Sequence, residues 1–421
     1  MSRFLTKPPS VSRRHCLWQA RVLAVAAVLC VALFTAGLIG GRWCGSSPVV
    51  LEADRIEDSD ARYHDGSLFL EAWHAVELQF FSTASLKPQS MVHGAISGMV
   101  ASLGDPHSRF VPPEQVRLDT DTFRGEFGGI GVSLVMEERE PTIVDVGTGS
   151  SAEKAGLCAG DVVRIVDGRQ LSGLSLDEIV LLIRGDVGTH VKLDLARGES
   201  VWSVDVVREP VEVPSLSWHA RPDGFGYVRI GLFSGRTGGE FEQALAALRL
   251  SGVHALVLDL RGNGGGVVES ALEVLGQLVG HGIGYREISK GGSELRHPIP
   301  FRAEPNDWPL AVLVDGGTAS ASELVAAAIR DHNRGVLIGA PTFGKGSMQG
   351  IFLLSDASSV RVTISRWLSP GGHPIESVGV RPDIVVRDGD SGSEVEDMVL
   401  QRAIEYLAST PKAALPCQVR T

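Results

Sequence analysis

The pattern of apolar and polar residues changes twice along this 421-residue chain after its first fifty residues. From Glu52 to Leu118, apolar residues recur at helical spacing, which predicts a small helical region. From about Phe123 to Pro210, short apolar runs lie between turn residues, which predicts a compact β-rich module with one helix in "SLDEIVLLIRG". From Val211 onward, strand and helix patterns alternate, which predicts a sheet covered by helices, and "EVEDMVLQRAIEYLAS" predicts a last helix.

A charge-free apolar run extends from Val22 to Gly41, after a flank with five basic residues and no acidic one. A run of about 20 residues is long enough to cross a bilayer as a helix, and a basic flank stays in the cytoplasm. A cleaved signal peptide is the alternative, but no clean A-x-A site ends the run, and "GRWC" at Cys44 is a poor lipobox. We expect an uncleaved single-pass anchor in the inner (cytoplasmic) membrane, with the rest of the chain on the extracytoplasmic side.

Composition narrows the classes of protein to consider. With 43% hydrophobic and 21% charged residues, the chain has an ordinary globular composition. Its formal net charge of −11 argues against a nucleic-acid-binding surface. Five cysteines are scattered without a CxxC pair and HExxH is absent, so the sequence predicts no metal site and no evident disulfide framework. We expect neither a metal nor a cofactor.

The segment "GAPTFGKGSMQ", Gly339 to Gln349, overlaps an apolar strand and contains most of a phosphate-binding loop, G-x-x-x-x-G-K. That loop needs a Ser or Thr after the lysine and then a helix. Here Gly346 follows Lys345, and "IFLLSDASSVRVTIS" predicts a β-hairpin, which provides no helix dipole for a phosphate. A P-loop ATPase is therefore the weakest of the alternatives.

Lys345 has the local setting of a general base. It lies between two glycines after the apolar strand, and no acidic residue occurs from His332 through Ser355 to keep it charged. Burial lowers the pKa of a lysine from about 10.4 toward 7 or 8, where the neutral amine can accept a proton. A solvated turn lysine is the alternative. None of the twelve histidines lies in a triad context and G-x-S-x-G is absent, so a Ser-His-Asp hydrolase is not supported.

The stretch "DGGTASASE", Asp315 to Glu323, joins a predicted strand to a predicted helix. Ser320 and Glu323 fit the S-x-x-E capping box, so Ser320 could serve only as a helix cap. Alternatively, Ser320 is an exposed nucleophile beside free backbone donors, and the Ala321 amide stabilises an oxyanion.

A second glycine turn, "LDLRGNGGG" from Leu258 to Gly266, fails the G-x-G-x-x-G dinucleotide fingerprint because Val267 stands at the last glycine position. The turn is either a tight strand-to-helix connection or a second oxyanion donor, and spacing alone leaves both open.

Together these segments resemble the carboxyl-terminal processing proteases, also called tail-specific proteases. The similarity runs from "GAISGMVASLGDPHSRF" to "SPGGHPIESVGVRPDI", and "GTASASE", "PTFGKGSMQ" and "DLRGNGGG" match the family's nucleophile, lysine and D-L-R-x-N-x-G-G segments. The resemblance implies that Ser320 is the nucleophile, that Lys345 is the general base and that Gln349 orients the lysine. It implies an oxyanion hole made by Ala321 and one residue of the Gly265 and Gly266 pair, without deciding which.

The β-rich module resembles a PDZ domain, through "SSAEKAGLCAGDVVRIVDG" and the loop "GGIGV". Free N–H groups around Gly129, Ile130 and Gly131 would hold a chain-terminal carboxylate, and Val132 would begin the strand to which a peptide adds. An ordinary glycine hairpin is the alternative. Cys158 stands where a polar residue is common and the terminal helix is short, but neither departure affects the proposed dyad.

The resemblance implies an α/β fold, with a crotonase-like protease core of mixed sheet and helices, a PDZ domain and an N-terminal transmembrane helix. The boundaries that we predict are 1–45 for the flank and anchor, 46–118 for the helical region, 119–210 for the PDZ domain, 211–393 for the protease core and 394–421 for the tail.

The predicted function is that of a serine endopeptidase that cleaves proteins near their C-termini, with substrate tails selected by the PDZ domain. Its expected partners are proteins with accessible C-terminal tails and the membrane, together with further copies of itself or an activating protein. A membrane-anchored PDZ adaptor with a silent protease core is the alternative. The sequence names neither the physiological substrate nor the effect of the PDZ domain on activity.

Overall fold

The computed structural model describes residues 66–82, 86–137, 139–386 and 397–409. The apolar run from Val22 to Gly41, predicted as a membrane anchor, lies outside these residues. Within the described ranges, no helix combines the length and the apolar character needed to cross a bilayer.

The N-terminal part contains the predicted helices and one unpredicted strand. Its elements are α2 (Gly66–Gln79), α3 (Pro88–Ala101), β1 (Arg109–Val111) and α4 (Pro113–Arg124). Gly125 caps the C-terminus of α4 in a left-handed conformation, with a φ of 75°, which glycine adopts most readily. Strand β1 has only three residues, too few to show the period-two alternation by which a strand is recognised in a sequence.

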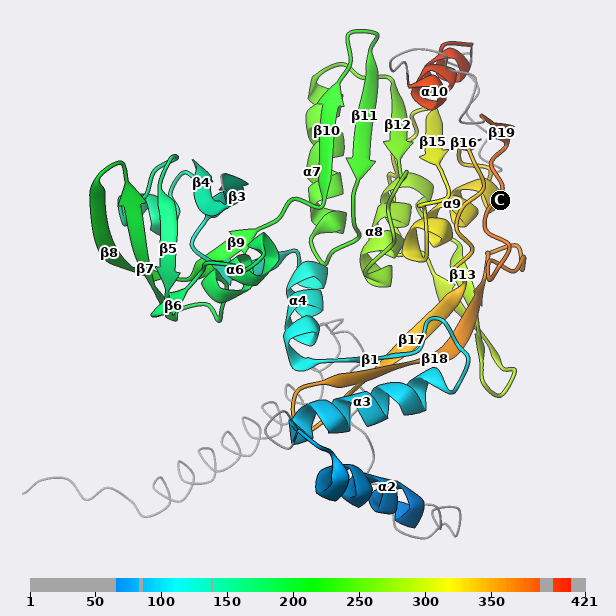
Figure 1. Ribbon diagram of the computed structural model, residues 1–421. Helices are drawn as coiled ribbons and strands as arrows, with labels where there is room; N and C mark the ends of the chain where they lie inside the picture. Colours follow the sequence, from blue (N-terminus) through cyan, green and yellow to red (C-terminus); the bar gives the residue numbers. More distant parts are fainter. Residues whose placement is uncertain (1–65, 83–85, 138, 387–396, 410–421) are drawn as a thin grey trace, which may run out of the picture. The chain divides into compact units, whose positions relative to one another are not determined.

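The β-rich module contains one antiparallel six-stranded sheet, with strand order β3-β4-β5-β7-β8 and β6 paired with β5 (Figure 1). Its strands are β3 (Val132–Glu137), β4 (Glu140–Val146), β5 (Val162–Val166), β6 (Arg169–Gln170), β7 (His190–Arg197) and β8 (Ser200–Val207). A separate ribbon pairs β2 (Glu126–Gly129) with β9 (Glu209–Glu212). The helices are α5 (Ser151–Lys154) and α6 (Leu176–Ile183), the latter at the predicted position and capped by Ser175 and Glu178.

The packing of this module leaves one edge of its sheet open for strand addition. Its core consists of fully buried side chains that include Ile143, Val163, Ile179 and Leu193. Strand β3 is at the edge of the sheet, and α6 packs beside it. An open edge strand next to a helix is the geometry with which a sheet accepts an extended peptide.

The α/β part is built on a second six-stranded sheet, of order β10-β11-β12-β15-β16-β19, in which β10 alone is antiparallel to its neighbour. The strands are β10 (Leu216–Ala220), β11 (Phe225–Ile230), β12 (Ala255–Asp259), β15 (Leu310–Val314), β16 (Val336–Gly339) and β19 (Ile384–Val385). Between them run α7 (Thr237–Leu250), α8 (Val268–Val279) and α9 (Ala321–Asp331), and α10 (Met398–Ser409) follows. The predicted alternation of strands and helices is confirmed.

Side chains of successive residues in the central strands are buried on opposite faces of this sheet. On one face Leu256, Leu258 and Val312 pack with α7, α8 and α9, and on the other Val257 and Leu313 pack with α10. Both faces are covered, so the strands are continuously apolar, as expected for a mainly parallel sheet. Figure 1 shows these helices flanking the strands.

A further sheet is organised around β18 (Ser359–Leu368). It contains β13 (Ile283–Ser289), β14 (Glu294–Pro298) and β17 (Ser347–Leu353) as well as β1. Strands β17 and β18 form the hairpin predicted after Lys345. On its other edge β18 pairs with β13 and with β1, in a register that sets Arg109 opposite Arg361. The N-terminal part therefore supplies a strand to a sheet whose other strands come from residues 283–368.

Arg261, which follows β12, links the central sheet to the last helix. Its guanidinium donates hydrogen bonds of 2.6 Å to Asp259 and to Asp397, which immediately precedes α10. The Tyr227 hydroxyl donates to Asp259 at 2.6 Å. Burial and this hydrogen bond raise the pKa of Tyr227 to about 12. The arginine of the "DLRGN" segment is thus a structural residue that holds α10 on the sheet.

Candidate active site

Ser320 lies in the turn between β15 and α9, directly before the first residue of the helix. Its φ of 58° and ψ of −122° are unusual for a residue with a side chain and cost roughly 1–3 kcal/mol. Such strain persists only where surrounding contacts impose the conformation, and it is frequent at active sites. The side chain remains partly exposed. The turn therefore presents a hydroxyl at a helix N-terminus, as a nucleophile requires.

Backbone and side-chain hydrogen bonds attach this turn to the glycine turn that follows β12. The Ala319 N–H donates to the Asn263 carbonyl at 2.9 Å, and the Thr318 hydroxyl donates to the Leu260 carbonyl at 2.9 Å. The Gly262 N–H donates to the Asp315 carboxylate at 2.9 Å. The two glycine-rich turns that the sequence analysis treated separately therefore form one structural unit.

Gly265 lies against the predicted nucleophile. A Cβ atom at Gly265 would lie 2.7 Å from the Ser320 Cβ and 2.9 Å from the Ala321 nitrogen. These separations are too short for any side chain, and Gly265 also has a φ of 102°. Glycine is required at this position because the backbone approaches the Ser320 turn closely.

Gly265 and Gly266 differ in whether their backbone N–H groups are already hydrogen-bonded. The Gly265 N–H donates to the Asn263 side-chain oxygen at 2.9 Å and is already satisfied. The Gly266 N–H has no acceptor within the described part of the chain. Ala321 is the first residue of α9, so its N–H has no intrahelical acceptor either. The available donors beside Ser320 are those of Ala321 and Gly266, which favours Gly266 as the second donor.

Glu323 connects the Ser320 turn to the loop that carries Lys345. Its fully buried carboxylate accepts the Ser320 N–H at 2.9 Å and the Lys345 N–H at 2.8 Å. It also accepts the Gly344 N–H at 2.7 Å and the Thr342 hydroxyl at 2.5 Å. Four donors compensate the desolvation of this charge. The sequence predicted Glu323 only as a capping residue, and its second role in holding the lysine loop was missed.

Lys345 is half-buried, as the sequence analysis expected for a general base. Burial is the main cause that lowers its pKa below the ordinary lysine value, and the positive charges of Arg109 and Arg361 lower it further. Glu376 and Glu323 act in the opposite direction without reversing the shift. The surroundings of Lys345 favour its neutral amine more than water does. The neutral amine is the form that can accept a proton.

Gln349 lies on β17, four residues after Lys345 and next to an irregularity in the β17–β18 pairing. Its side-chain nitrogen donates to Ser347 and to Thr363, each at 3.2 Å. Its oxygen has no partner within the described ranges and is available to a further donor. This arrangement is compatible with a residue that accepts a hydrogen bond from a lysine.

The "GDPHSRF" segment brings four polar residues to this site that the sequence analysis did not assign. Ser108 accepts a hydrogen bond from the Thr363 N–H at 3.1 Å and donates to Asp105 at 2.5 Å. The His107 ring lies 3.7 Å from the Glu376 carboxylate, and Arg109 is among the charges that act on Lys345. Only the pairing of β1 with β18, which joins distant parts of the chain, could have indicated these contacts.

The loop "GGIGV" of the β-rich module also carries unsatisfied backbone donors. Gly129 ends β2, and Val132 begins the edge strand β3. Between them, the N–H groups of Ile130 and Gly131 donate no hydrogen bond to any described residue. The Ile130 carbonyl, by contrast, accepts from the Ala152 N–H at 3.0 Å, which fixes the loop. Two adjacent free amides before an edge strand can bind a carboxylate.

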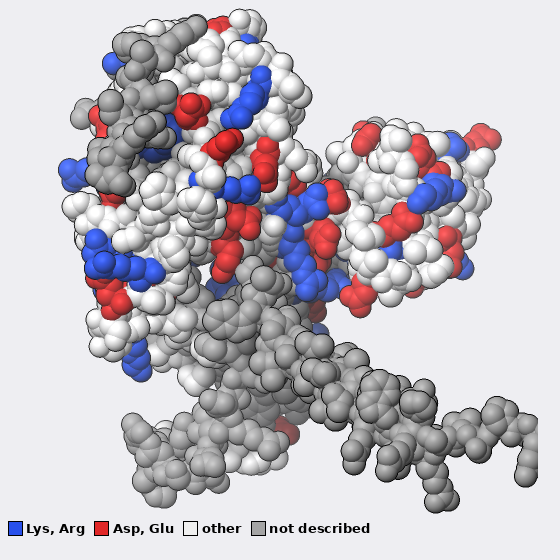
Figure 2. All heavy atoms as spheres, turned by 180° about the vertical axis from the view of Figure 1, so that it is seen from behind, with Lys and Arg blue, Asp and Glu red and all other residues white. Residues whose placement is uncertain are grey.

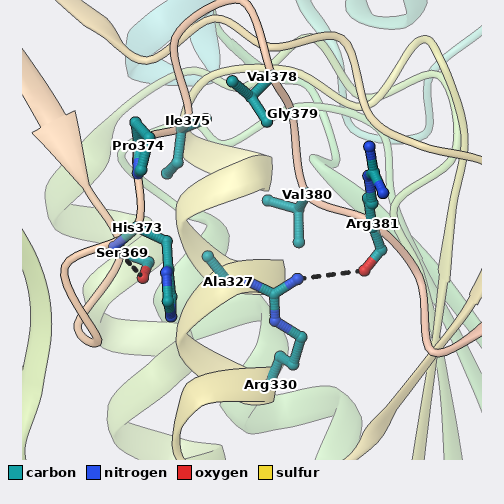
Figure 3. A pocket seen from close by; sticks show the side chains of 10 residues that line it. All are labelled: Ala327, Arg330, Ser369, His373, Pro374, Ile375, Val378, Gly379, Val380 and Arg381. Atoms are coloured by element: carbon teal, nitrogen blue, oxygen red, sulfur yellow. Dashed lines mark hydrogen bonds between the residues drawn. The ribbon is translucent and has the colours of Figure 1, made fainter.

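A cavity of about 240 Å³ lies between α9 and the segment that follows β18 (Figure 3). Ala327, Ile375 and Val380 provide apolar lining, and Arg330 donates to the Arg381 carbonyl at 3.2 Å beside it. The lining includes neither Ser320 nor Lys345, so the site is defined by the side chains described above. On the face shown in Figure 2, basic and acidic side chains lie beside one another in several places, while most of the described surface belongs to other residues.

Comparison with known proteins adds independent information. A model of peptidase family S41 matches residues 224–386, and a model of the PDZ domain matches residues 142–197. The chain is 32% identical over 359 residues to a carboxy-terminal-processing protease of Bartonella bacilliformis, covering 83% of this chain and 81% of that protein. It is 36% identical over 298 residues to the carboxy-terminal processing protease CtpA of Bacillus subtilis, covering 70% of this chain and 63% of that protein.

A solved structure of a photosystem II D1 C-terminal processing protease is 32% identical, with a TM-score of 0.44. The match covers 76% of this chain and 92% of that one. The Bartonella protein is matched over more than two thirds of its length, whereas the chain spans less than two thirds of the Bacillus protein.

Proposed function

Because the chain belongs to peptidase family S41, as a serine-type carboxyl-terminal processing protease with a PDZ domain, we propose that it cleaves protein tails with a Ser320–Lys345 dyad. The observation that carries this proposal is the buried Glu323 carboxylate, which holds the Ser320 turn and the Lys345 loop together. These contacts support a site in which a strained serine at a helix N-terminus works with a half-buried lysine whose pKa is lowered.

In the proposed reaction, the neutral Lys345 amine takes the Ser320 proton as the serine oxygen attacks the scissile carbonyl carbon. The Ala321 and Gly266 N–H groups stabilise the oxyanion of the tetrahedral intermediate. The Lys345 ammonium then gives its proton to the leaving amine, and an acyl ester on Ser320 remains. Water attacks this ester with Lys345 again acting as base, which releases the shortened protein and restores the serine.

We further propose that the PDZ domain selects the tails. A terminal carboxylate would bind the Ile130 and Gly131 N–H groups, and the last residues would add to β3 beside α6. The partly exposed apolar side chains that α6 contributes, such as Val180 and Leu181, favour tails that end in small or apolar residues. We also propose that the run from Val22 to Gly41 is a membrane anchor. Such an anchor puts the catalytic part outside the cytoplasm. Recovery of a soluble chain shortened near Gly41 would contradict it.

The test of the proposed function is cleavage of an unstructured protein with an apolar C-terminus, followed by mass spectrometry of the products. We expect the wild-type protein to shorten the substrate near its C-terminus. The Ser320→Ala variant should lose about 10⁶-fold of kcat. If Ser320→Ala cleaves as fast as wild type, the assignment of the nucleophile is wrong.

A PDZ adaptor with a silent protease core is the second candidate, and the free amides of Ile130 and Gly131 support the binding step that it shares with the enzyme. The same experiment separates the two functions. An adaptor would bind the tail in wild-type and Ser320→Ala proteins alike and cleave it in neither.

A further inference from the structure

Phe343 exposes an aromatic ring in the loop that carries Lys345. The residue is 61% exposed, although the residues on either side of it are buried. Single apolar residues are common on protein surfaces, so exposure by itself indicates no function. The position of Phe343 is what distinguishes it. Its N–H donates to the Thr318 carbonyl at 3.0 Å, so its backbone contacts the turn of the proposed nucleophile Ser320, two residues from the proposed base.

Hydrogen bonds on both sides fix the backbone of Phe343. The Thr342 N–H donates to the Val380 carbonyl at 3.2 Å, and the Thr342 hydroxyl accepts the Val380 N–H at 2.7 Å. On the other side, the Gly344 N–H donates to the buried Glu323 carboxylate at 2.7 Å. Because the backbone is held before and after Phe343, a small shift of the loop cannot bury the ring. Its apolar surface gains hydrophobic stabilisation only when a partner covers it.

A second exposed apolar side chain, Val378, lies on the segment that packs against this loop. It is 56% exposed. The Ser377 N–H donates to the Gly344 carbonyl at 2.8 Å, and a Cβ atom at Gly344 would lie 3.1 Å from the Val378 nitrogen. Val378 also lines the cavity between α9 and the segment after β18, together with Ile375 (Figure 3). It therefore joins the exposed apolar surface at the lysine loop to the apolar lining of the cavity.

We propose that Phe343, with Val378 beside it, forms an apolar subsite that receives a substrate side chain next to the scissile bond. The subsite rests on the proposed Ser320–Lys345 dyad. Consecutive Cα atoms of a peptide lie about 3.8 Å apart, so residues beside the carbonyl that Ser320 attacks come close to the segment bonded to its turn. Lys345 is the single charged residue among residues 339–349, which suits an apolar occupant.

This subsite and the PDZ domain would read different parts of a substrate. The PDZ domain would bind the last residues of the tail, whereas Phe343 would contact a residue at the point of cleavage. A tail with an apolar end but a polar cleavage region would then bind normally and be cleaved slowly. The enzyme would apply two apolar criteria, one to the end of the chain and one to the bond.

The test uses the full-length protein and peptides that share the same last residues and differ only at the scissile bond. Mass spectrometry of a reference peptide identifies the bond that is cut. Matched peptides then carry leucine or glutamine on each side of this bond in turn. The readout is the ratio of kcat/KM for the leucine and glutamine peptides, in which changes to the dyad itself cancel. We expect the wild-type protein to prefer leucine by at least about tenfold on one side of the bond.

Variants at Phe343 should change this preference in proportion to the apolar surface that they keep. Phe343→Ala removes the ring and leaves the backbone bond to Thr318, so the preference should fall to about threefold or less. Phe343→Leu keeps an apolar side chain and should retain most of the preference. Val378→Ser should reduce it by a smaller factor, about twofold to threefold, because Val378 covers less of the occupant.

Phe301→Ala is the matched control. Phe301 follows β14 and is 76% exposed. Its neighbours Ile299 and Arg302 donate backbone hydrogen bonds to the carbonyls of Gly282 and Gly280, away from the lysine loop. The same change of side chain at this position should leave the leucine preference at its wild-type value. Circular dichroism and thermal unfolding verify that all variants are folded.

Peptides with amidated C-termini separate the subsite from the PDZ domain. The leucine preference at the scissile bond should persist in these peptides, because Phe343 does not contact the terminal carboxylate. If the preference disappears on amidation, it belongs to the PDZ domain and the subsite is wrong.

The remaining outcomes separate the subsite from the dyad. If Ser320→Ala and Lys345→Ala are inactive while Phe343→Ala keeps the wild-type preference, the subsite is wrong and the dyad stands. A wild-type protein without any preference at the bond would overturn the subsite as well. So would a Phe343→Ala variant that changes the oligomeric state but not the preference, because the ring would then contact a second copy of the chain. If Ser320→Ala cleaves normally, the proposed function itself fails, whatever Phe343 does.

Discussion

The two proposed sites of this protein would use backbone N–H groups to receive negative charge, and they are held in different ways. In the PDZ domain, Ile130 and Gly131 offer their amides from a loop that is anchored mainly by backbone hydrogen bonds. In the protease core, Ala321 and Gly266 offer theirs from two turns fixed by the buried side chains of Asn263 and Glu323. The PDZ loop suits a terminal carboxylate that is already charged. The donors in the protease core, by contrast, must be held rigidly before the oxyanion charge develops.

The comparison predicts that changes in the core affect catalysis while leaving tail binding intact. The largest effect is expected for Lys345→Arg, because a guanidinium stays protonated and cannot accept the serine proton. We expect at least about 10⁴-fold loss of kcat with unchanged peptide binding, measured by fluorescence anisotropy. Full activity in this variant would rule out the dyad.

In the wild-type enzyme, activity should rise with pH through the lowered pKa of Lys345, because deprotonation creates the base. Binding of the tail to the PDZ domain should stay flat over the same range, since its donors are amides. A kcat that falls as pH rises from 6 to 9 would assign the base to another group.

Asn263→Ala probes the rigidity of the core site without touching the nucleophile. The change removes the acceptor for the Gly265 N–H and the bond from the Asn263 amide to the Ile230 carbonyl. The Gly264–Gly265 peptide group then loses its acceptor, which loosens the turn that carries the Gly266 N–H although the Phe233 N–H still donates to the Gly265 carbonyl, so kcat should fall by up to about 10²-fold. The measurement is kcat on a folded variant, with thermal unfolding as the control, and an unchanged kcat would remove Gly266 from the oxyanion hole.

The PDZ site is tested by comparing one peptide with a free and an amidated C-terminus. A charge-assisted hydrogen bond contributes about 1.5–3 kcal/mol, so amidation should weaken binding about ten- to a hundredfold. At saturating peptide, kcat should be the same for both, because the core amides do not contact the terminal carboxylate. Equal affinity for the two peptides would remove this loop from substrate selection.

The smallest expected effect concerns stability. Burial of Lys345 disfavours its charged form, so Lys345→Met should raise the free energy of unfolding at pH 7 by about 0.5–2 kcal/mol while abolishing activity. The gain should shrink as pH rises from the lowered folded-state pKa toward the ordinary value, because the neutral lysine carries less of the desolvation cost. Denaturant unfolding at pH 7 and pH 10 measures the difference.

The sequence predicted the elements of the α/β core well because their signals are local. The helix from Val268 to Val279 and the hairpin after Lys345 followed from spacing and turn residues alone. The proposed residues Ser320 and Lys345 lie in motifs of a few residues, and the resemblance assigned their roles. The sequence also predicted Ala321 as an oxyanion donor, but the choice between Gly265 and Gly266 required coordinates, because it depends on which amides are already hydrogen-bonded.

Contacts between distant segments could not be predicted. Strand β1 is too short to be recognised, so the polar residues from Asp105 to Arg109 had no visible connection to Lys345. The helix α4 also crosses the expected boundary at residue 118, because helical periodicity does not reveal which domain a helix joins. The second role of Glu323 was hidden since a capping box already explains a glutamate at that position.

The pairing of β1 with β18 has a consequence for the order in which the enzyme matures. Arg109 and Arg361 lie about 250 residues apart in the chain, so their contact forms only after nearly all of the catalytic part has been synthesised. Contacts of such large sequence separation form late and slowly during folding. A nascent chain that lacks β18 would therefore have Ser320 but lack the complete surroundings of the proposed base, Lys345. We therefore expect proteolytic competence to appear only after β18 has been synthesised and paired with β1.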